Sequence, residues 1–216
     1  IWGQMAPGLG LTVRHDRLTT NRAGNMIWRF VTLQGDGAVG CTVNVNCFDP
    51  LNFLRVDPST SNYVDHCSLR YGLDQVWTSN YEDTVDVSQN RSSFNHNILA
   101  EADPDHSTAV IYNIWNANEV GTKLDIGEHT FSRNFTYNIS HRHQNINVRG
   151  DFEFFNNYVV NWRTRMGRFN NTPNVDFHRN HFQEGGVTVQ QSNRPLRGHK
   201  LNHGSDWGDG EPTLYF

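Results

Sequence analysis

Histidine and arginine side chains gather in the second half of the chain, where they could move protons and hold anions. His141 and His143 flank Arg142. Imidazoles titrate near neutral pH, whereas a guanidinium normally stays protonated. If this segment is a strand, its side chains alternate between two faces, and both histidines lie on the face opposite Arg142.

A second basic cluster follows Trp162 and contains Arg163, Arg165, Arg168 and Arg179. Arginine binds carboxylates through two parallel hydrogen bonds, so this cluster predicts a surface for an anionic polymer. The alternative is an ordinary solvated edge.

Short segments of similar pattern recur along the chain and indicate how these residues are positioned. Each segment alternates apolar and polar residues, passes through a small polar residue, usually Asn, and becomes apolar again. The repeats are anchored at Phe30, Cys67, Asn97, Asn134, Asn157 and Asn180. The spacings are 37, 30, 37, 23 and 23 residues, which fit a 23-residue unit with occasional inserted loops.

A strand-type repeat of this length predicts a parallel β-helix, in which each coil of three short strands stacks on the next. Asn side chains at equivalent turns can hydrogen-bond to one another, and Asn tolerates the left-handed backbone that such turns need. We therefore expect Asn134, Asn157 and Asn180 to occupy equivalent turns. The alternative is that Asn is simply a common loop residue.

The whole chain, 1–216, is predicted to be one all-β domain of about seven to eight coils of roughly 23 residues. Residues 107–118 favour a strand because they are rich in Val, Ile, Tyr and Trp. Residues 194–216 are rich in Gly, Pro, Asp and His and are expected to form an irregular C-terminal tail.

Composition excludes several classes of protein. Charged residues make up only 19% of the chain, and Lys occurs only at Lys123 and Lys200, which argues against a helical bundle. Six Trp, seven Tyr and 13 Phe argue against disorder. No apolar run approaches the ~20 residues of a membrane span. The net charge of −4 predicts no nucleic-acid partner.

Cysteines and glycosylation sequons bear on the compartment only weakly. Cys41 and Cys47 are close enough in sequence to bridge a loop, and Cys67 reads as a small buried hydrophobe. Sequons occur at Asn90, Asn134, Asn138 and Asn170, about as many as chance predicts. Because the sequence starts at Ile1 without Met, we expect it to be processed or cropped.

Three segments together resemble a known family. Residues 3–14 read G-Q-M-A-P-G-L-G-L-T-V-R, residues 64–75 read V-D-H-C-S-L-R-Y-G-L-D-Q, and residues 156–162 read N-N-Y-V-V-N-W. They resemble, in order, the segments G-Q-T-A-P-G-G-G-I-T-L-R, I-D-H-C-S-x-x-W-x-x-D-E and N-N-V-I-Y-N-W of the bacterial pectate lyase superfamily. The resemblance spans about residues 3–186 and implies a right-handed parallel β-helix.

The resemblance also implies an activity, the cleavage of an acidic polysaccharide by calcium-assisted β-elimination outside the cell. Residues 134–146 resemble the family segment N-L-F-x-H-N-x-x-R-N-P-x-I, whose Arg is the catalytic base, and Arg142 takes that position. Gln144 replaces the family's Pro, and Asn147 stands where a second Arg is often found. With the two flanking histidines, the predicted catalytic set is Arg142, His141 and His143. The predicted substrate set is Arg149 together with Arg163, Arg165 and Arg168 of the basic cluster.

The calcium positions implied by the resemblance are depleted in carboxylates. Asp74 matches the first acid of the family's D-E pair, but Gln75 replaces the second. Asn52 stands where another acid is usual, with Asp49 three residues before it. Thr78 replaces a third acid. We therefore expect a weak calcium site at Asp74, Asp49 and Asn52, because affinity falls with carboxylate number; the alternative for Asp74 is a turn cap.

The Asp65-His66 pair belongs to the same motif, and we interpret it mainly as structural, an Asp that accepts backbone N–H groups beside a His partner. The first hypothesis for function is a secreted lyase acting on a polygalacturonate-like polymer. The second is a β-helix without catalysis that serves as a structural or carbohydrate-binding extracellular protein. In that case the strand edge near residues 11–13 could support end-to-end self-association.

Overall fold

The fold is known from a computed structural model that describes residues 1, 3–5, 10–14, 18–21, 24–35, 50–54, 60–72, 75–81, 90–102, 108–114, 125–139, 142–162, 165–169, 173–183, 202–203 and 213–215. In this part of the chain there are 21 β-strands and one short 3₁₀ helix, η1 (Gly3–Met5). No helix among these residues has the length and apolar character needed to cross a membrane. The prediction of an all-β chain is confirmed.

The strands form three parallel sheets of seven strands each. Sheet 1 contains β1 (Leu11–Arg14), β4 (Val31–Gln34), β7 (Ser68–Arg70), β10 (Ile98–Ala100), β13 (Phe135–Tyr137), β16 (Tyr158–Val160) and β19 (His181–Gln183). Sheet 2 contains β2 (Leu18–Asn21), β5 (Leu51–Leu54), β8 (Gln75–Tyr81), β11 (Thr108–Ile114), β14 (Arg142–Ile146), β17 (Arg165–Phe169) and β20 (Asn202–His203). Sheet 3 contains β3 (Ile27–Arg29), β6 (Ser61–Asp65), β9 (Arg91–Asn95), β12 (Asp125–Ser132), β15 (Arg149–Phe155), β18 (Asn174–His178) and β21 (Thr213–Tyr215).

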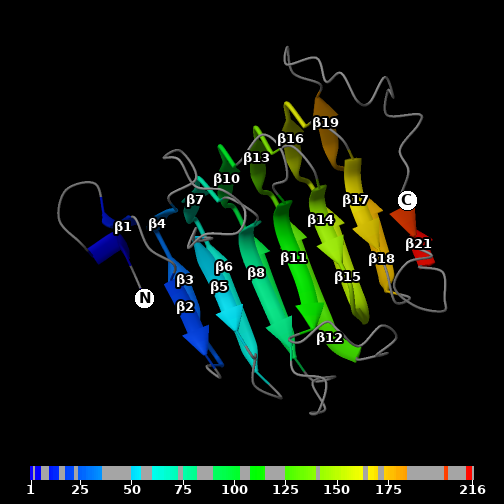
Figure 1. Ribbon diagram of the computed structural model, residues 1–216, viewed down its shortest axis with the longest axis horizontal. Helices are drawn as coiled ribbons and strands as arrows, with labels where there is room; N and C mark the ends of the chain where they lie inside the picture. Colours follow the sequence, from blue (N-terminus) through cyan, green and yellow to red (C-terminus); the bar gives the residue numbers. More distant parts are fainter. Residues whose placement is uncertain are drawn as a thin grey trace, which may run out of the picture.

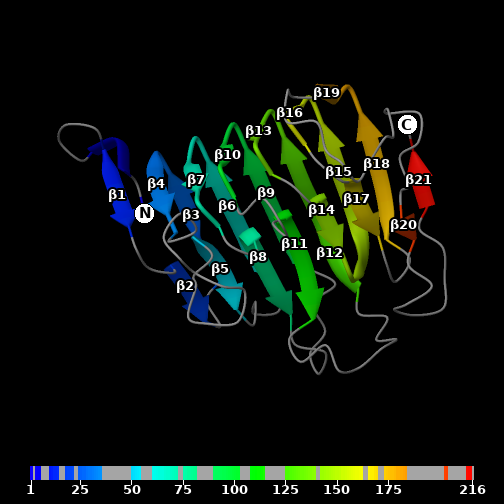
Figure 2. The ribbon, with the colours of Figure 1, turned by 45° about the horizontal axis from the view of Figure 1, so that its top comes forward.

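Successive strands visit the three sheets in turn, so every third strand returns to the same sheet beside its predecessor. The colours therefore advance from one end of each sheet to the other in Figures 1 and 2. This arrangement is compatible with a parallel β-helix. The expectation of an irregular tail is corrected at two places, because β20 pairs with β17 and β21 pairs with β18.

The turn between each sheet 3 strand and the following sheet 1 strand repeats through the molecule. Its first residue has a left-handed backbone, with φ between 52° and 56°, at Phe30, His66, His96, Arg133, Asn156 and Arg179. At three of these turns the second residue is an Asn whose side chain points into the core. These residues, Asn97, Asn134 and Asn157, are all buried. The prediction that the Asn residues occupy equivalent turns is confirmed.

These Asn side chains form a hydrogen-bonded ladder. The Asn134 Oδ1 accepts from both the backbone N–H and the side-chain amide of Asn97, at 2.8 and 3.1 Å. Its own amide nitrogen donates to the carbonyl of Phe94 at 2.9 Å and to Asn157 Oδ1 at 3.2 Å. Asn157 and Asn180 continue the same pattern. The ladder thus ties four successive turns together with bonds that are largely buried.

Two details of the predicted turns are wrong. The strand register aligns Thr32 with Ser68, so Val31 rather than Phe30 is the partner of Cys67 in the ladder column. The ladder Asn residues are also not the left-handed ones, since that conformation falls on the residue before each of them. The reason for Asn in the ladder is its side-chain amide, which donates and accepts at once.

The core is built from columns of equivalent residues. In sheet 3, Phe94, Phe131, Phe154 and Phe177 follow one another on neighbouring strands, with ring centroids 5.3 to 5.8 Å apart. In sheet 1, the corresponding buried column contains Leu33, Leu69, Leu99 and Val159. Burying one such side chain contributes roughly 1.5–3 kcal/mol, so the columns hold the three sheets against one another.

The structure also bears on Cys67, on residues 107–118 and on the sequons. Cys67 is a buried free thiol, as predicted, and its backbone N–H donates to Asn97 Oδ1 at 2.8 Å. Within the stretch 107–118, for which a strand is predicted, residues 108–114 form β11, and the rest of the stretch lies outside the described residues. The sequons at Asn90 and Asn134 are buried at 1% and 2% exposure, so the folded chain cannot be glycosylated there. Cys41, Cys47 and Asn170 lie outside the described residues.

A buried histidine makes the stability of this core sensitive to pH. His129 Nε2 lies 2.7 Å from the carbonyl of Ile126, which only accepts, so Nε2–H donates and Nδ1 accepts from Ser92 Oγ at 2.6 Å. The ring is stacked on Phe152 at a centroid distance of 5.2 Å. Burial lowers the pKa of His129 from 6.5 to about 4, against a smaller opposing effect of the Ile126 carbonyl.

The unfolded chain therefore takes up a proton at His129 near pH 6.5, whereas the folded chain does so only near pH 4. The contribution of neutral His129 to the free energy of unfolding is fully present above pH 6.5. We expect the free energy of unfolding to fall by about 3 kcal/mol as the pH drops to 4. Urea unfolding between pH 7 and pH 4 measures this slope. The slope should flatten in His129→Gln and persist in His181→Gln, whose side chain is exposed on sheet 1; an unchanged slope in His129→Gln would contradict the assignment.

Candidate functional site

Sheet 2 gathers most of the residues for which the sequence predicts a role. Asn52 is on β5, Arg142 and His143 are on β14, and Arg165 and Arg168 are on β17. Four further residues lie outside the described residues, but in the sequence each stands one or two positions before a strand of sheet 2: Asp49, Asp74, His141 and Arg163. Segments far apart in the sequence thus meet at one sheet.

The register of sheet 2 relates these positions to one another. Gln75, Thr108, Arg142 and Arg165 are aligned across β8, β11, β14 and β17. Two strand steps therefore separate Arg142 from Gln75, the neighbour of Asp74, which corresponds to about 10 Å between the backbones. The sequence predicts the same separation.

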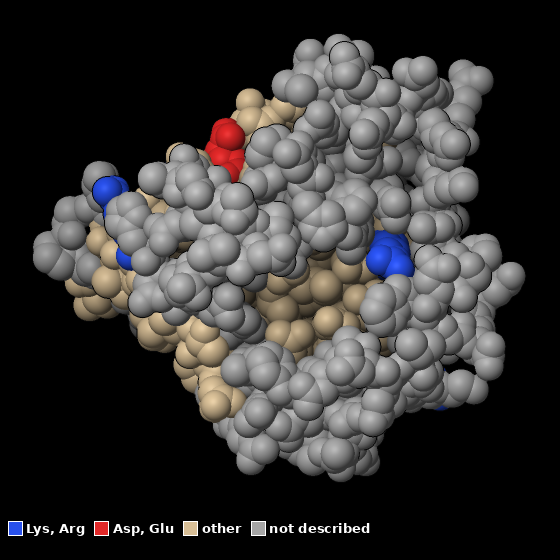
Figure 3. Space-filling view, in the orientation of Figure 1, with Lys and Arg blue, Asp and Glu red and all other residues tan. Residues whose placement is uncertain are grey.

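Sheet 2 faces the viewer in Figure 1, and the space-filling view of this side shows uncharged described residues with a Lys or Arg side chain beside them (Figure 3). Polar side chains of β8 and β14 are almost fully buried, among them Thr78, Asn145 and His143. With 1% exposure, the His143 side chain cannot contact a polymer at the surface, which argues against its predicted catalytic role.

Arg149 does not join this group. It is the first residue of β15 and therefore belongs to sheet 3, where it aligns with Asp125 of β12. It is separated from the arginines of β14 and β17 because those strands belong to sheet 2, and the chain passes from sheet 2 to sheet 3 between β14 and β15.

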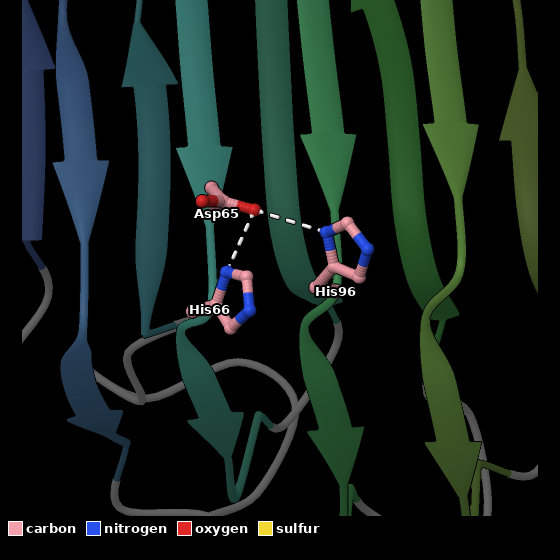
Figure 4. Close-up of side chains that lie close together, drawn as sticks. All are labelled: Asp65, His66 and His96. Carbon is pink, nitrogen blue, oxygen red and sulfur yellow. Dashed lines mark hydrogen bonds and ion pairs between the residues drawn. The ribbon is translucent and has the colours of Figure 1, made fainter.

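The clearest cluster of titratable side chains lies elsewhere, at the turn between sheets 3 and 1 (Figure 4). Asp65, the last residue of β6, has a buried carboxylate with 2% side-chain exposure. Its Oδ1 lies 2.9 Å from His66 Nδ1 and 3.2 Å from His96 Nδ1. Its Oδ2 accepts from Arg29, at 2.9 Å from Nε and 2.8 Å from the terminal nitrogen. The Asp65 carboxylate thus binds three basic side chains.

Repetition of the turn produces this geometry. Asp65 aligns with Arg29 on one side and with Asn95 on the other, so the left-handed residues His66 and His96 follow at equivalent positions. Their rings are stacked with centroids 4.8 Å apart, and the tilted ring of Phe30 lies on the other side of His66 at a centroid distance of 5.1 Å. Both imidazoles are partly open to solvent, with 46% and 41% side-chain exposure.

Burial acts to raise the pKa of Asp65, but hydrogen bonds from His66, His96 and Arg29 and the charge of His66 outweigh it and lower the pKa below 3.8. Asp65 is therefore ionised at neutral pH. An ionised carboxylate with two imidazoles can orient the rings, pass protons or complete a metal site. The structural interpretation of Asp65 and His66 accounts for the first of these.

His96 and Arg29 were missed by reasoning from the sequence, although a signal was present. Aligning Cys67 with Asn97 places His66 and His96 at the same turn position. Arg29 was hidden because the first anchor was set one residue early, at Phe30 instead of Val31.

The chain matches no protein-family model, no curated protein and no solved structure.

Proposed function

We propose that the three sheets form a right-handed parallel β-helix that cleaves an acidic polysaccharide, such as polygalacturonate, by calcium-assisted β-elimination. The observation that carries this proposal is the convergence on sheet 2. Apart from Arg149, the residues for which the sequence predicts catalytic, substrate-binding or calcium roles come from four separate segments, and these segments include or adjoin β5, β8, β14 and β17.

Arg142 is the proposed base. Its neighbour in register, Arg165, stands on the adjacent strand of the same sheet. Only a neutral guanidine can accept a proton from the substrate, and a nearby positive charge raises the share of that neutral form. Arg142 takes the C5 proton of the uronate, and that electron pair forms the C4–C5 double bond. The C4–O bond breaks with its electrons on the leaving oxygen, which takes a proton from water.

Arg165 and Arg168, both on β17, together with Arg163 bind uronate carboxylates in this proposal. Guanidinium groups suit carboxylates because they offer two parallel N–H donors. Arg149 lies on sheet 3 and has no part in the proposed reaction.

The residues proposed for calcium have suitable chemistry. Asp49, Asp74 and Asn52 offer hard oxygen donors, and Asn52 on β5 is aligned with Thr78 on β8, the strand that Asp74 precedes. Calcium bound there would neutralise the uronate carboxylate and so acidify the C5 proton.

The test is the ultraviolet absorbance of the 4,5-unsaturated product when the protein is mixed with polygalacturonate in the presence and absence of calcium. Calcium-dependent growth of this absorbance is expected. A chain that is folded by circular dichroism but yields no unsaturated product from polygalacturonate or other polyuronates favours the alternative of a non-catalytic structural or carbohydrate-binding protein.

Asp74→Ala is expected to raise the calcium concentration needed for half-maximal rate, because the site loses one of its two carboxylates. The maximal rate at saturating calcium should change much less. The matched control is Asp151→Ala, an exposed carboxylate on β15 in sheet 3, which should leave the calcium dependence as it is. Equal calcium curves for Asp74→Ala and the unmodified chain would remove Asp74 from the site.

A further inference from the structure

We propose that Asp65, His66 and His96 bind one divalent transition metal ion with the preferences of Zn²⁺, at a site separate from the proposed lyase site. Among the described residues these three form the group of His, Cys, Asp and Glu side chains whose ligand atoms all lie within 4.8 Å of one another. They lie at the turn between sheets 3 and 1, whereas the residues proposed for catalysis are on or beside sheet 2.

The distances suit a metal with little rearrangement. Zinc binds imidazole nitrogen and carboxylate oxygen at about 2.0–2.2 Å, so two ligand atoms of a tetrahedral site are about 3.3 Å apart. The Asp65 Oδ1 lies 2.9 Å from His66 Nδ1 and 3.2 Å from His96 Nδ1. Both rings turn this nitrogen toward the carboxylate (Figure 4). These two distances need to lengthen by only a few tenths of an ångström to reach the zinc spacing, and the ligand atoms of all three residues lie within 4.8 Å of one another.

The surroundings hold the three ligands in place. Arg29 binds Oδ2 of Asp65 and leaves Oδ1 for the metal, the kind of supporting contact that ligating carboxylates usually have. Stacking between His66 and His96, and the contact of His66 with the tilted Phe30 ring, restrain the planes of the imidazoles. The backbone turn that carries each His is set by the ladder behind it, since Cys67 N–H donates to Asn97 Oδ1.

The ligand set selects the class of metal. Two imidazole nitrogens and one carboxylate oxygen suit Zn²⁺, Co²⁺ or Ni²⁺, whereas Ca²⁺ and Mg²⁺ prefer oxygen ligands alone. Three protein ligands with exposed imidazoles leave a fourth position for water, as in catalytic rather than closed structural zinc sites. The proton on each Nδ1 must move to Nε2 or be released when the metal binds, so binding weakens in acid.

The experiment is calorimetric titration of the full chain with Zn²⁺, and in parallel with Ca²⁺, at neutral pH. Co²⁺ provides a second measurement, because a tetrahedral Co²⁺ site gives visible d–d absorption. His66→Gln and His96→Gln are the test variants, chosen because both side chains are half-exposed and their loss should leave the fold intact. Circular dichroism verifies this.

His178→Gln is the matched control. His178 also bonds an Asp through Nδ1, at 2.9 Å from Asp176 Oδ1, and lies on the neighbouring column of the same side of the molecule. Among the described residues this pair has no third ligand within reach. Removing His178 therefore takes away one imidazole without touching the proposed site.

We expect one zinc ion per chain, and a Zn²⁺ affinity that falls by more than about 100-fold in His66→Gln and in His96→Gln, since loss of a direct ligand exceeds the 10–100-fold effect of an outer contact. His178→Gln should bind like the unmodified chain, and Ca²⁺ should not compete. The proposal is overturned if no Zn²⁺ binds, or if folded His66→Gln and His96→Gln bind it as tightly as His178→Gln. Neither outcome depends on lyase activity.

Discussion

Asn134→Ala is expected to destabilise the chain by about 3–5 kcal/mol, far more than a surface Asn. The substitution removes the acceptor of the Asn97 backbone N–H and the donor to the Phe94 carbonyl, both of them buried. Each buried polar group left without a partner costs about 1–3 kcal/mol, and the side-chain bonds to Asn97 and Asn157 are lost as well. Urea unfolding followed by circular dichroism measures the loss.

Asn174→Ala is the control for this experiment. Asn174 is exposed on β18 and donates one side-chain hydrogen bond, to Asp151 at 2.8 Å. Its replacement should change stability by less than about 0.5 kcal/mol, as surface substitutions usually do. If the two variants lost similar stability, the ladder would not be a major source of cohesion.

Arg142→Lys is expected to lower kcat on polygalacturonate by a factor on the order of 10²–10⁴, the usual contribution of a positioned base. KM should change little, because the lost interaction is made in the transition state. Lysine keeps the positive charge but is shorter and strongly hydrated, so it cannot take over the position of the guanidinium. Initial rates across a range of polymer concentrations separate the two constants.

Arg165→Lys provides the comparison, since Arg165 is the register partner of Arg142 on the neighbouring strand. As a proposed carboxylate ligand it should raise KM more than it lowers kcat. If Arg142→Lys raised KM and left kcat unchanged, Arg142 would be a binding residue and the base would have to be sought elsewhere.

The sequence predicted the architecture well because the repeat is local. The Asn residues of the ladder and the Phe residues before them recur 23 residues apart from Asn134 to Asn180, and each copy obeys the same alternation of apolar and polar side chains. The first turn was misplaced because Val31 has no amide to mark the ladder position, while Phe30 looks like an anchor. Hydrophobicity alone does not distinguish the two.

The candidate sites were harder to predict because they depend on register between coils of unequal length. In the Asp65 cluster, Arg29 lies 36 positions before Asp65 in the sequence and His96 lies 31 positions after it. These residues become neighbours only when the strands are aligned. The burial of His143 also follows from its place on β14 and from no local property of its sequence. The placement of the predicted site residues on or beside sheet 2, in contrast, can be predicted from the sequence. It follows once each motif is assigned to the same position within the repeating unit.

The repeated turn also determines where the chain can change in length during evolution. Two residues separate the sheet 3 strand from the next sheet 1 strand at β6–β7, β9–β10, β12–β13, β15–β16 and β18–β19. The connection from sheet 1 to sheet 2 varies much more, from three residues at β1–β2 to 18 at β19–β20. An added residue at the short turn would displace an Asn from the ladder and reverse the faces of the strand that follows. Insertions and deletions are therefore tolerated beside sheet 2, where new loops can reshape what the surface recognises, while the opposite corner keeps its length.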